Sequence, residues 1–569
     1  MNLTLFIPRV LIERAKSAGC QCFKERGEAN LLALLLMFTV AFTLSILCAS
    51  AAPGNAKDES QKLTDSEVLH VDKFGQNAST DWTGKVHSEK DLTEIDVSEK
   101  LDLQNNIACS QWDDFGALKT GPNLDASGFF AVKEVYGRWW FVSPAGKPFY
   151  SIALDCVVPG SLSPLRKSGE EKEEQANETA AKTTKKKESA ILAKYDWIPK
   201  PDGDFAAARN KDSVSFYVAN LQRKWGAEWR KNFEKRVFER MRSWNFNSLG
   251  NWSDDVLQSK NFPYFSMGPS TWELKINYID GDIPDVYDPR FEEEAVRVCA
   301  KDLSKSKTDK WLVGYFLDNE MPWWNIPYDV LALDSKEPCK SAWLSKLRAK
   351  YATIEKLNKS WGTKANNFGD LRWVGDKATS AAKRDMAELL RDFANRFYSG
   401  WYKAMKHADP NHLVLGSRIP YPMDEVVDAC ARNTDVLSFN HYAIDLPKKF
   451  DEYYRKYRKP ILIGEYDFDS FDAGLKQAFV KVKDQKQRAI GYTYYTEQAA
   501  AKPYMIGTHY FQYLDEPLTG RGDGESSFNG FVSVADRPYP DLVQAARTTN
   551  CRIYEIHSGK LRPSTEKPI

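Results

Sequence analysis

Apolar and polar positions along the chain follow two different periods. From about residue 220 onward, stretches with apolar residues three or four positions apart are separated by short, almost uninterrupted apolar runs. The first kind predicts amphipathic helices at 225–243, 291–305, 342–358, 377–408 and 472–489. The second kind predicts strands at 247–249, 311–317, 412–415, 435–439, 460–463 and 505–511. Short apolar strands that alternate with helices indicate a parallel sheet covered by helices.

The number of these strand–helix units favours an eight-stranded parallel β/α barrel, the TIM barrel, over an open doubly wound sheet. A glycine-rich phosphate loop would argue for the open sheet, but the chain has no GxGxxG or GxxxxGK[ST] motif. Three further short strands are predicted at 129–135, 138–142 and 148–154. The predicted fold class is therefore α/β: a TIM barrel over residues 121–550 with a short N-terminal β-hairpin at its start and a flexible N-terminal extension.

The N-terminal part of the chain has the pattern of an export signal. Basic residues precede an uncharged run at 31–52 that ends in small residues. The run is also long enough to span a bilayer, so residues 1–52 are predicted to be either a signal peptide or a membrane anchor that tethers the protein. On either alternative the remainder is exported, to the periplasm, to the medium or to the outward face of a membrane.

Composition predicts two segments without a stable fold of their own. Residues 53–120 are polar and show little periodicity, which indicates a flexible spacer. A charged segment poor in apolar residues, near 163–190, is predicted to be a disordered insertion in the barrel. Residues 551–569 are predicted to be a C-terminal tail.

Charge and aromatic content narrow the class of partner. The chain has 79 basic and 78 acidic side chains, a formal net charge of +1, so no basic face that would bind nucleic acid is evident. This balance fits a neutral substrate better than a polyanion. Aromatic residues make up 13% of the chain, and aromatic rings stack on the apolar faces of sugars, although a large barrel core also uses many of them.

No cofactor or metal site is predicted. The seven histidines are dispersed without an HExxH motif, and no GxSxG motif of a serine hydrolase occurs. The cysteines beyond the signal segment lack zinc spacing; they are Cys109, Cys156, Cys299, Cys339, Cys430 and Cys551. Export would permit a disulfide, for example between Cys109 and a barrel cysteine, but spacing does not determine the pairing.

Two glutamates directly follow predicted barrel strands. The run 311–317 leads into Asp318, Asn319 and Glu320, and the run 460–463 leads into Gly464 and Glu465. Catalytic residues of TIM barrels lie at the carboxyl ends of the strands, so both carboxyl groups are predicted to meet at the barrel mouth. A pair of carboxyl groups in one cleft suits glycosidic cleavage, with Glu320 as acid/base and Glu465 as nucleophile. Either glutamate alone is equally consistent with a helix cap or an ion pair.

Other polar and aromatic residues at strand ends are candidate substrate contacts. Asn319 is placed to hold a sugar hydroxyl, and Trp323 and Trp324 beyond Glu320 are candidate sugar platforms, with a place in the core as the alternative. His441 is a candidate too, although a lone histidine is more often a structural hydrogen-bond partner. The remaining candidates are Asn251, Trp252, Arg418, Asn440, Tyr442, His509 and Gln512.

These motifs resemble glycoside hydrolase family 50, the β-agarases, within the clan of retaining TIM-barrel glycosidases that also holds β-galactosidases. The resemblance rests on GRWWFVSPAGKPF at 137–149, VGYFLDNE at 313–320 and HYFQYLDEPLTGR at 509–521, followed by Gly524-Glu525 and by NGFV at 529–532. It covers roughly residues 128–547. It implies hydrolysis of β-1,4 bonds in agarose without a cofactor, and it gives Glu320 the acid/base role and Glu465 the nucleophile role.

The chain departs from the family's pattern in two places. The stretch 464–468 reads GEYDF where Ser-Glu-Phe-His-Phe is more usual, and a polar segment stands where many relatives carry an N-terminal β-sandwich. Two alternatives therefore stay open: a hydrolase of another β-galactan or β-galactoside on the same barrel, and a catalytically silent polysaccharide-binding protein. The sequence leaves the oligomeric state open.

Overall fold

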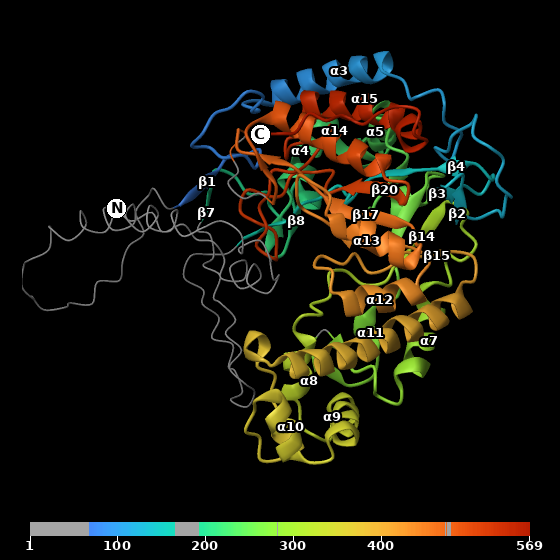
Figure 1. Ribbon diagram of the computed structural model, residues 1–569. Helices are drawn as coiled ribbons and strands as arrows, with labels where there is room; N and C mark the ends of the chain where they lie inside the picture. Colours follow the sequence, from blue (N-terminus) through green and yellow to red (C-terminus); the bar gives the residue numbers. More distant parts are fainter. Residues whose placement is uncertain (1–67, 166–192, 282, 473, 475–478) are drawn as a thin grey trace, which may run out of the picture. The chain divides into compact units, whose positions relative to one another are not determined.

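Eight parallel strands form the central sheet of the computed structural model (Figure 1), which describes residues 68–165, 193–281, 283–472, 474 and 479–569. Except for residues 374–378, the described residues belong to one compact unit. The strands are β5 (Ser151–Leu154), β10 (Ser248–Leu249), β11 (Tyr264–Met267), β14 (Leu312–Phe316), β15 (Leu413–Val414), β16 (Leu437–Asn440), β17 (Ile461–Tyr466) and β20 (Met505–Tyr510).

The strands are neighbours in chain order. The sheet runs β15-β14-β11-β10-β5-β20-β17-β16, so the last strand, β20, pairs in parallel with the first, β5. The two strands at the ends of this order also approach each other, because Val436 N donates to Val414 O at 3.3 Å and Ile419 N donates to Ser438 O at 3.0 Å. A curled parallel sheet of eight strands covered by helices confirms the predicted TIM-like α/β fold.

Helices follow most of the strands and cover the sheet. The helices are α3 (Glu89–Asn105), α4 (Phe216–Trp225), α5 (Trp229–Ser243), α6 (Asp255–Gln258), α7 (Phe291–Asp302), α8 (Ile326–Ala332), α9 (Pro338–Tyr351), α10 (Ile354–Trp361), α11 (Ser380–Ala408), α12 (Asp424–Asn433), α13 (Lys448–Tyr457), α14 (Gln485–Ala501) and α15 (Pro540–His557). The predicted helix at 472–489 is wrong in its position: α14 begins only after Asp484, whose side chain caps it by accepting from Gln487 N.

Other strands lie outside the central sheet. An antiparallel sheet joins β2 (Ala131–Val135), β3 (Arg138–Val142) and β4 (Pro148–Phe149), with a tight turn in which Tyr136 and Gly137 both have positive φ. Phe141 and Phe149 from it pack into the same apolar cluster as residues of the central strands. The others are β1 (Leu69–Val71), β6 (Ser163–Pro164), β7 (Ala193–Tyr195), β8 (Arg209–Asn210), β9 (Ser213–Val214), β12 (Tyr278–Asp280), β13 (Ile283–Pro284), β18 (Asp469–Ser470) and β19 (Lys481–Val482).

Residues 68–120, predicted to be flexible spacer, are ordered. The strand β1 pairs in parallel with β7. Helix α3 begins with a capping box, in which the Ser88 side chain accepts from the backbone N–H of Asp91 and the Asp91 side chain accepts from the backbone N–H of Ser88. Figure 1 shows α3 (blue) beside α15, and Arg547 of α15 forms an ion pair with Asp102 of α3.

Charged side chains attach α3 to the rest of the fold. Asp96 and Glu99 are buried on its inner face, where Arg236 Nη1 donates to Glu99 at 2.6 Å and Arg240 Nε donates to the same carboxylate at 2.6 Å. Both arginines belong to α5. Because Asp96 and Glu99 share the buried face with Leu92, which packs in an apolar cluster, the helix has no continuous apolar stripe in the sequence, and the spacer prediction was wrong for this part.

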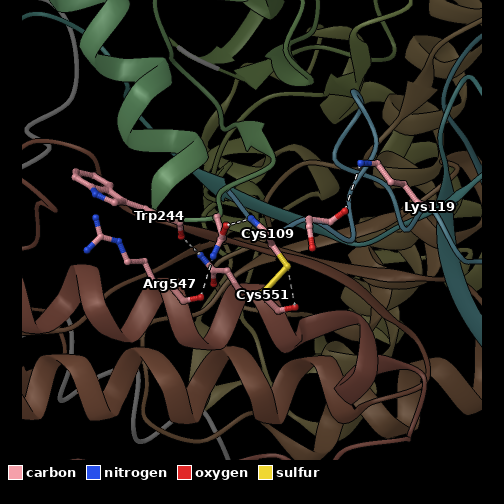
Figure 2. The surroundings of a disulfide bond; sticks show 8 residues. Cys109, Lys119, Trp244, Arg547 and Cys551 are labelled. Carbon is pink, nitrogen blue, oxygen red and sulfur yellow. Dashed lines mark hydrogen bonds between the residues drawn. A yellow bond between two sulfur atoms is a disulfide. The ribbon is translucent and has the colours of Figure 1, made fainter. Parts of the chain in front are cut away.

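A disulfide between Cys109 and Cys551 closes a loop of 442 residues (Figure 2). Hydrogen bonds surround it: Cys109 N donates to Asn245 Oδ1 at 2.8 Å, and Asn245 Nδ2 donates to Arg547 O at 3.0 Å. Cys551 belongs to α15, so the predicted C-terminal tail begins inside a helix. The other cysteines of the described residues, Cys156, Cys299, Cys339 and Cys430, are free thiols.

We expect removal of this disulfide to lower stability. Because it constrains the unfolded chain, the double variant Cys109→Ser/Cys551→Ser should lose about 2–4 kcal/mol of unfolding free energy. Chemical denaturation with and without a thiol reductant measures this. Reduced wild-type protein should match the double variant, and identical midpoints for oxidised and reduced wild type would contradict the structural role of the bond.

The predictions for residues 1–52, 53–67 and most of the charged insertion fall outside the described residues. Within the part of the chain that the structure describes, no helix is both long and apolar enough to span a membrane.

Candidate active site

Glu320 lies just beyond the end of β14. Leu317 N donates to Gly416 O at 2.8 Å and continues the strand's pairing, and the chain then turns through Asp318 and Glu320, whose φ angles are +66° and +53°. Non-glycine residues adopt this left-handed region at a cost in free energy, and such residues cluster at functional sites. The turn brings the Glu320 carboxyl group to Asn440, whose Nδ2 donates to Glu320 Oε1 at 2.9 Å.

Glu465 lies near the end of β17 and is only 4% exposed. Both of its carboxyl oxygens accept hydrogen bonds, Oε1 from Arg418 Nη2 and Oε2 from the Tyr442 hydroxyl. A guanidinium group only donates, so this arrangement suits an ionised carboxylate whose position is fixed. Tyr442 is therefore an orienting partner of Glu465.

One hydrogen-bond network connects the two glutamates. Arg418, which binds Glu465, also donates from Nε to Asn319 Oδ1 at 2.8 Å. Asn440, which binds Glu320, is the register partner of Glu465 in the pairing of β16 with β17. The structure therefore brings Asn319, Glu320, Arg418, Asn440 and Glu465 together, although they come from four different strand ends.

The environment of Glu320 raises its pKa to about 7, mainly because burial penalises the charged form and secondly because of the negative charge of Glu465. The hydrogen bond from Asn440 and the charge of Arg418 oppose this shift. A carboxyl group with this pKa is protonated at weakly acidic pH and can donate a proton near neutrality.

Asp155, which the sequence analysis missed, also binds Arg418, through the same Nη2 group that donates to Glu465. It follows directly after β5, is fully buried, and accepts from Arg418 Nη2 at 3.0 Å and from Asn251 N at 2.8 Å. Burial raises its pKa to about 7. The sequence signal was present, because Asp155 is the polar residue directly after the apolar run at 148–154. The sequence analysis assigned that run to the N-terminal hairpin and not to the barrel.

Gly464 leaves room for this arrangement. A Cβ at this position would lie 2.8 Å from Asn440 Oδ1 and 3.1 Å from Arg418 Nη1. The side chains beside both glutamates therefore occupy the space that any other residue would fill.

We expect Asp155→Asn to lower kcat/KM by about 10²-fold, because small misplacements of catalytic groups have effects of this size. The amide keeps the shape of the side chain but removes the charge that orients Arg418. The matched control is Asp285→Asn, another buried carboxyl group that accepts two backbone N–H groups away from the site. If Asp155→Asn and wild type have equal activity at equal thermal midpoints, the charge of Asp155 is not needed to orient Arg418.

Three of the predicted substrate contacts have buried side chains. Trp323 is 2% exposed and packs on Phe397 and Tyr398, in the core rather than the cleft. His509 is fully buried inside the sheet, where Nε2 bonds Ser151 Oγ at 2.9 Å, and burial lowers its pKa well below 6.5.

The third is Asn251, which is also fully buried and whose Nδ2 contacts Met267 Sδ at 2.9 Å. Its contribution to the site is the backbone N–H that binds Asp155. Arg418 is likewise fully buried, and its guanidinium group binds Glu465 and Asn319.

The remaining candidates lie around the network. Trp252 is 38% exposed and covers the Arg418 guanidinium group, with the ring centroid 4.6 Å from Cζ. Trp324 packs edge-on against the exposed ring of Tyr421. The Nδ1 atom of His441 bonds the Tyr495 hydroxyl at 3.0 Å, and burial lowers the pKa of this histidine to about 4.

The segment after β20 contributes further charges. Gln512 Nε2 donates to Glu516 Oε1 at 3.3 Å, and Arg521 forms ion pairs with Glu516 and Glu525. Glu525 is close enough to Glu320 to raise its pKa further. Strand-end reasoning did not find Arg521 and Glu525, because they follow a loop and not a strand. Among the described residues, no group of three or more His, Cys, Asp or Glu side chains has an arrangement that would hold a metal ion.

Comparison with known proteins identifies the family. No family model matches the chain. An exo-β-agarase of known structure is 31% identical, covers 89% of this chain and is itself covered to 75%, with a TM-score of 0.76. The structure of PfGH50B is 30% identical over 88% of this chain and 76% of that chain, with a TM-score of 0.74. The chain belongs to glycoside hydrolase family 50.

Two curated relatives that are named β-agarases also match this chain. β-Agarase B of Vibrio sp. (strain JT0107) is 31% identical over 535 residues, which are 86% of this chain and 55% of that protein. β-Agarase A of the same strain is 30% identical over 87% of this chain and 53% of that protein. The chain thus spans about half the length of the curated relatives it matches.

Proposed function

We propose that the protein is a retaining glycoside hydrolase that cleaves β-galactosidic bonds in an agarose-like polysaccharide through a covalent glycosyl-enzyme intermediate. The observation that carries the proposal is the pair of glutamates in one network, with Glu320 in an environment that keeps it protonated and Glu465 between two donors. Relatives in the same family are named β-agarases, which supports the choice of substrate.

The two glutamates divide the chemistry. Glu320 protonates the glycosidic oxygen as the bond to the leaving sugar breaks, and Glu465 attacks the anomeric carbon to form a glycosyl ester. Glu320, now ionised, then takes a proton from water, which attacks the same carbon and releases Glu465. This sequence requires the two carboxyl groups to be about 5–5.5 Å apart, so that no water fits between sugar and nucleophile.

Neighbouring residues orient the sugar. Because Arg418 occupies Asn319 Oδ1, the amide Nδ2 group of Asn319 is left for the sugar 2-hydroxyl. Trp252 and Trp324 provide rings for stacking on galactose units, and Gln512 and Tyr442 contribute polar groups at the mouth. These contacts require the eight strands to close into a barrel. In this proposal the N-terminal hairpin covers the end of the barrel opposite the mouth.

We propose an exported location for the enzyme. The polysaccharide substrate lies outside the cell, and residues 1–52 have the composition of a signal peptide or an anchor. The Cys109–Cys551 disulfide fits an oxidising compartment.

A panel of galactans tests the function. We expect the purified protein to release oligosaccharides from agarose, and to act weakly or not at all on porphyran, carrageenan and aryl β-galactosides. Glu465→Gln is the control for contaminating activity. Activity on another galactan but not on agarose would reject the substrate, and sugar binding without any hydrolysis would reject the enzyme.

A further inference from the structure

A cavity of about 630 Å³ lies apart from the two glutamates. It is bounded by the loop at 75–84, the start of α14, the segment 515–518 and the segment 533–541. Its volume is in the range of ligand-binding pockets, roughly 300–1,000 Å³. None of the lining residues belongs to the catalytic network or to the sugar contacts described above, so this cavity needs a separate explanation.

Aromatic side chains form one wall of the cavity. Trp82, Phe528 and Tyr539 line it; Trp82 packs against Phe528, whose ring centroid lies 5.1 Å from that of Tyr539. Lys85, which does not line the cavity, places Nζ 5.0 Å from the Trp82 ring centroid and holds that ring by a cation–π contact. A fixed aromatic wall of this kind suits the apolar face of a sugar ring.

The polar lining is acidic. It carries only two cations, Lys486 and Arg537, against six carboxyl groups: Asp81, Asp472, Asp484, Asp515, Glu516 and Asp541. Burial raises the pKa of Asp515 to about 7 and that of Glu516 to about 8, so these two groups add little negative charge near neutral pH. The oxygens of the other carboxylates only accept hydrogen bonds, so they pair with the hydroxyl groups of a neutral sugar and repel a sulfated one.

The cavity adjoins the catalytic mouth. Glu516 lines the cavity. It also accepts a hydrogen bond from Gln512, and its Oε1 atom lies 3.4 Å from Arg521 Nη1. A chain bound in the cavity is therefore close to the strand ends that carry the catalytic network, but is separated from them by the Glu516–Arg521 pair.

We propose that this cavity is a second, non-catalytic binding site for a neutral galactan chain, which holds the polymer beside the catalytic mouth. The identity of the sugar rests on the proposed function, whereas the existence of the site rests on the aromatic wall, the acidic lining and the position of Glu516. The site recognises an uncharged oligosaccharide and rejects a sulfated one.

A blocking variant tests the site. Thr83 is exposed and lines the cavity, so Thr83→Trp fills it without removing any packing; Thr80→Trp, in the same loop but outside the cavity, is the matched control. In a Glu465→Gln background, we expect Thr83→Trp to weaken binding to an agarose hexasaccharide and to agarose beads by about tenfold. Trp82→Ala should weaken both in the same way.

The outcomes separate this inference from the proposed function. If the wild type cuts agarose but Thr83→Trp and Trp82→Ala, both folded by thermal midpoint, bind the hexasaccharide as tightly as Thr80→Trp, the second site is refuted and the function stands. If the wild type cuts no agarose but Thr83→Trp still loses the binding, the function fails and the site stands. Equal binding of a carrageenan hexasaccharide would also overturn the proposal, because the acidic lining excludes sulfated chains.

Discussion

Glu465→Gln should reduce the turnover of agarose by at least about 10⁴-fold, the order of loss seen when a covalent nucleophile is removed from other hydrolases. The glutamine side chain keeps the volume of the buried site, and its single oxygen replaces one of the two acceptors that bind Arg418 and Tyr442. An amide does not form a glycosyl ester. Sugar binding should remain, because the loss affects the chemical step. Initial rates on agarose, together with the affinity for an oligosaccharide, measure both.

A matched variant distinguishes the loss of the nucleophile from a general effect of replacing a glutamate by glutamine. Glu452→Gln changes an exposed glutamate on α13 and should leave both rate and affinity at wild-type values. Retention of more than a few per cent of wild-type turnover in folded Glu465→Gln would show that Glu465 is not the nucleophile. External azide should restore turnover in Glu465→Ala, since a small anion can take the place of the missing carboxylate.

Glu320→Gln should lower kcat/KM on agarose by about 10²–10⁴-fold, the contribution of a general acid, with a much smaller loss on substrates whose leaving group needs no proton. The pH dependence follows from its pKa of about 7. The wild type needs Glu320 protonated to cleave the first bond, so kcat/KM should be retained below about pH 7 and fall above it. In Glu320→Gln this descending limb should disappear.

Asp155 provides the control for the pH profile, because burial raises its pKa to about 7 as well. If Glu320 is the titrating group, the pH profile of Asp155→Asn should keep the descending limb, although the rate of this variant is lower than that of the wild type. Persistence of the limb in Glu320→Gln, with its loss in Asp155→Asn, would assign the limb to Asp155 and remove Glu320 from the acid role.

The sequence predicted that the two glutamates come together, because the physical basis of this prediction is local. Each glutamate follows a short apolar run, and parallel strands collect the residues at their carboxyl ends at one edge of the sheet. The same reasoning applied to the end of β5 would have found Asp155. It was not applied there, because the chain from 148 to 154 looks like a hairpin strand, and only the structure shows that Pro148–Phe149 and Ser151–Leu154 belong to different sheets.

Other features depend on contacts that sequence patterns do not reveal. Adjacent Trp323 and Trp324 have the same surroundings in sequence, but the first packs on α11 in the core and the second contacts Tyr421. Helix α3 lacks an apolar stripe because its buried face carries Asp96 and Glu99, so hydrophobic periodicity did not detect it. Strand-end position therefore predicts which residues reach the mouth, but not which of them remain accessible there.

The anomeric configuration of the first product tests the central claim most directly. Proton NMR of a reducing-end galactose, recorded within the first minutes of oligosaccharide hydrolysis, shows which anomer forms before mutarotation. Attack by Glu465 and then by water inverts the same anomeric carbon twice, so the account predicts the β-anomer as the first product. Initial release of the α-anomer would mean a single displacement by water, and would contradict the assignment of Glu465 as a nucleophile.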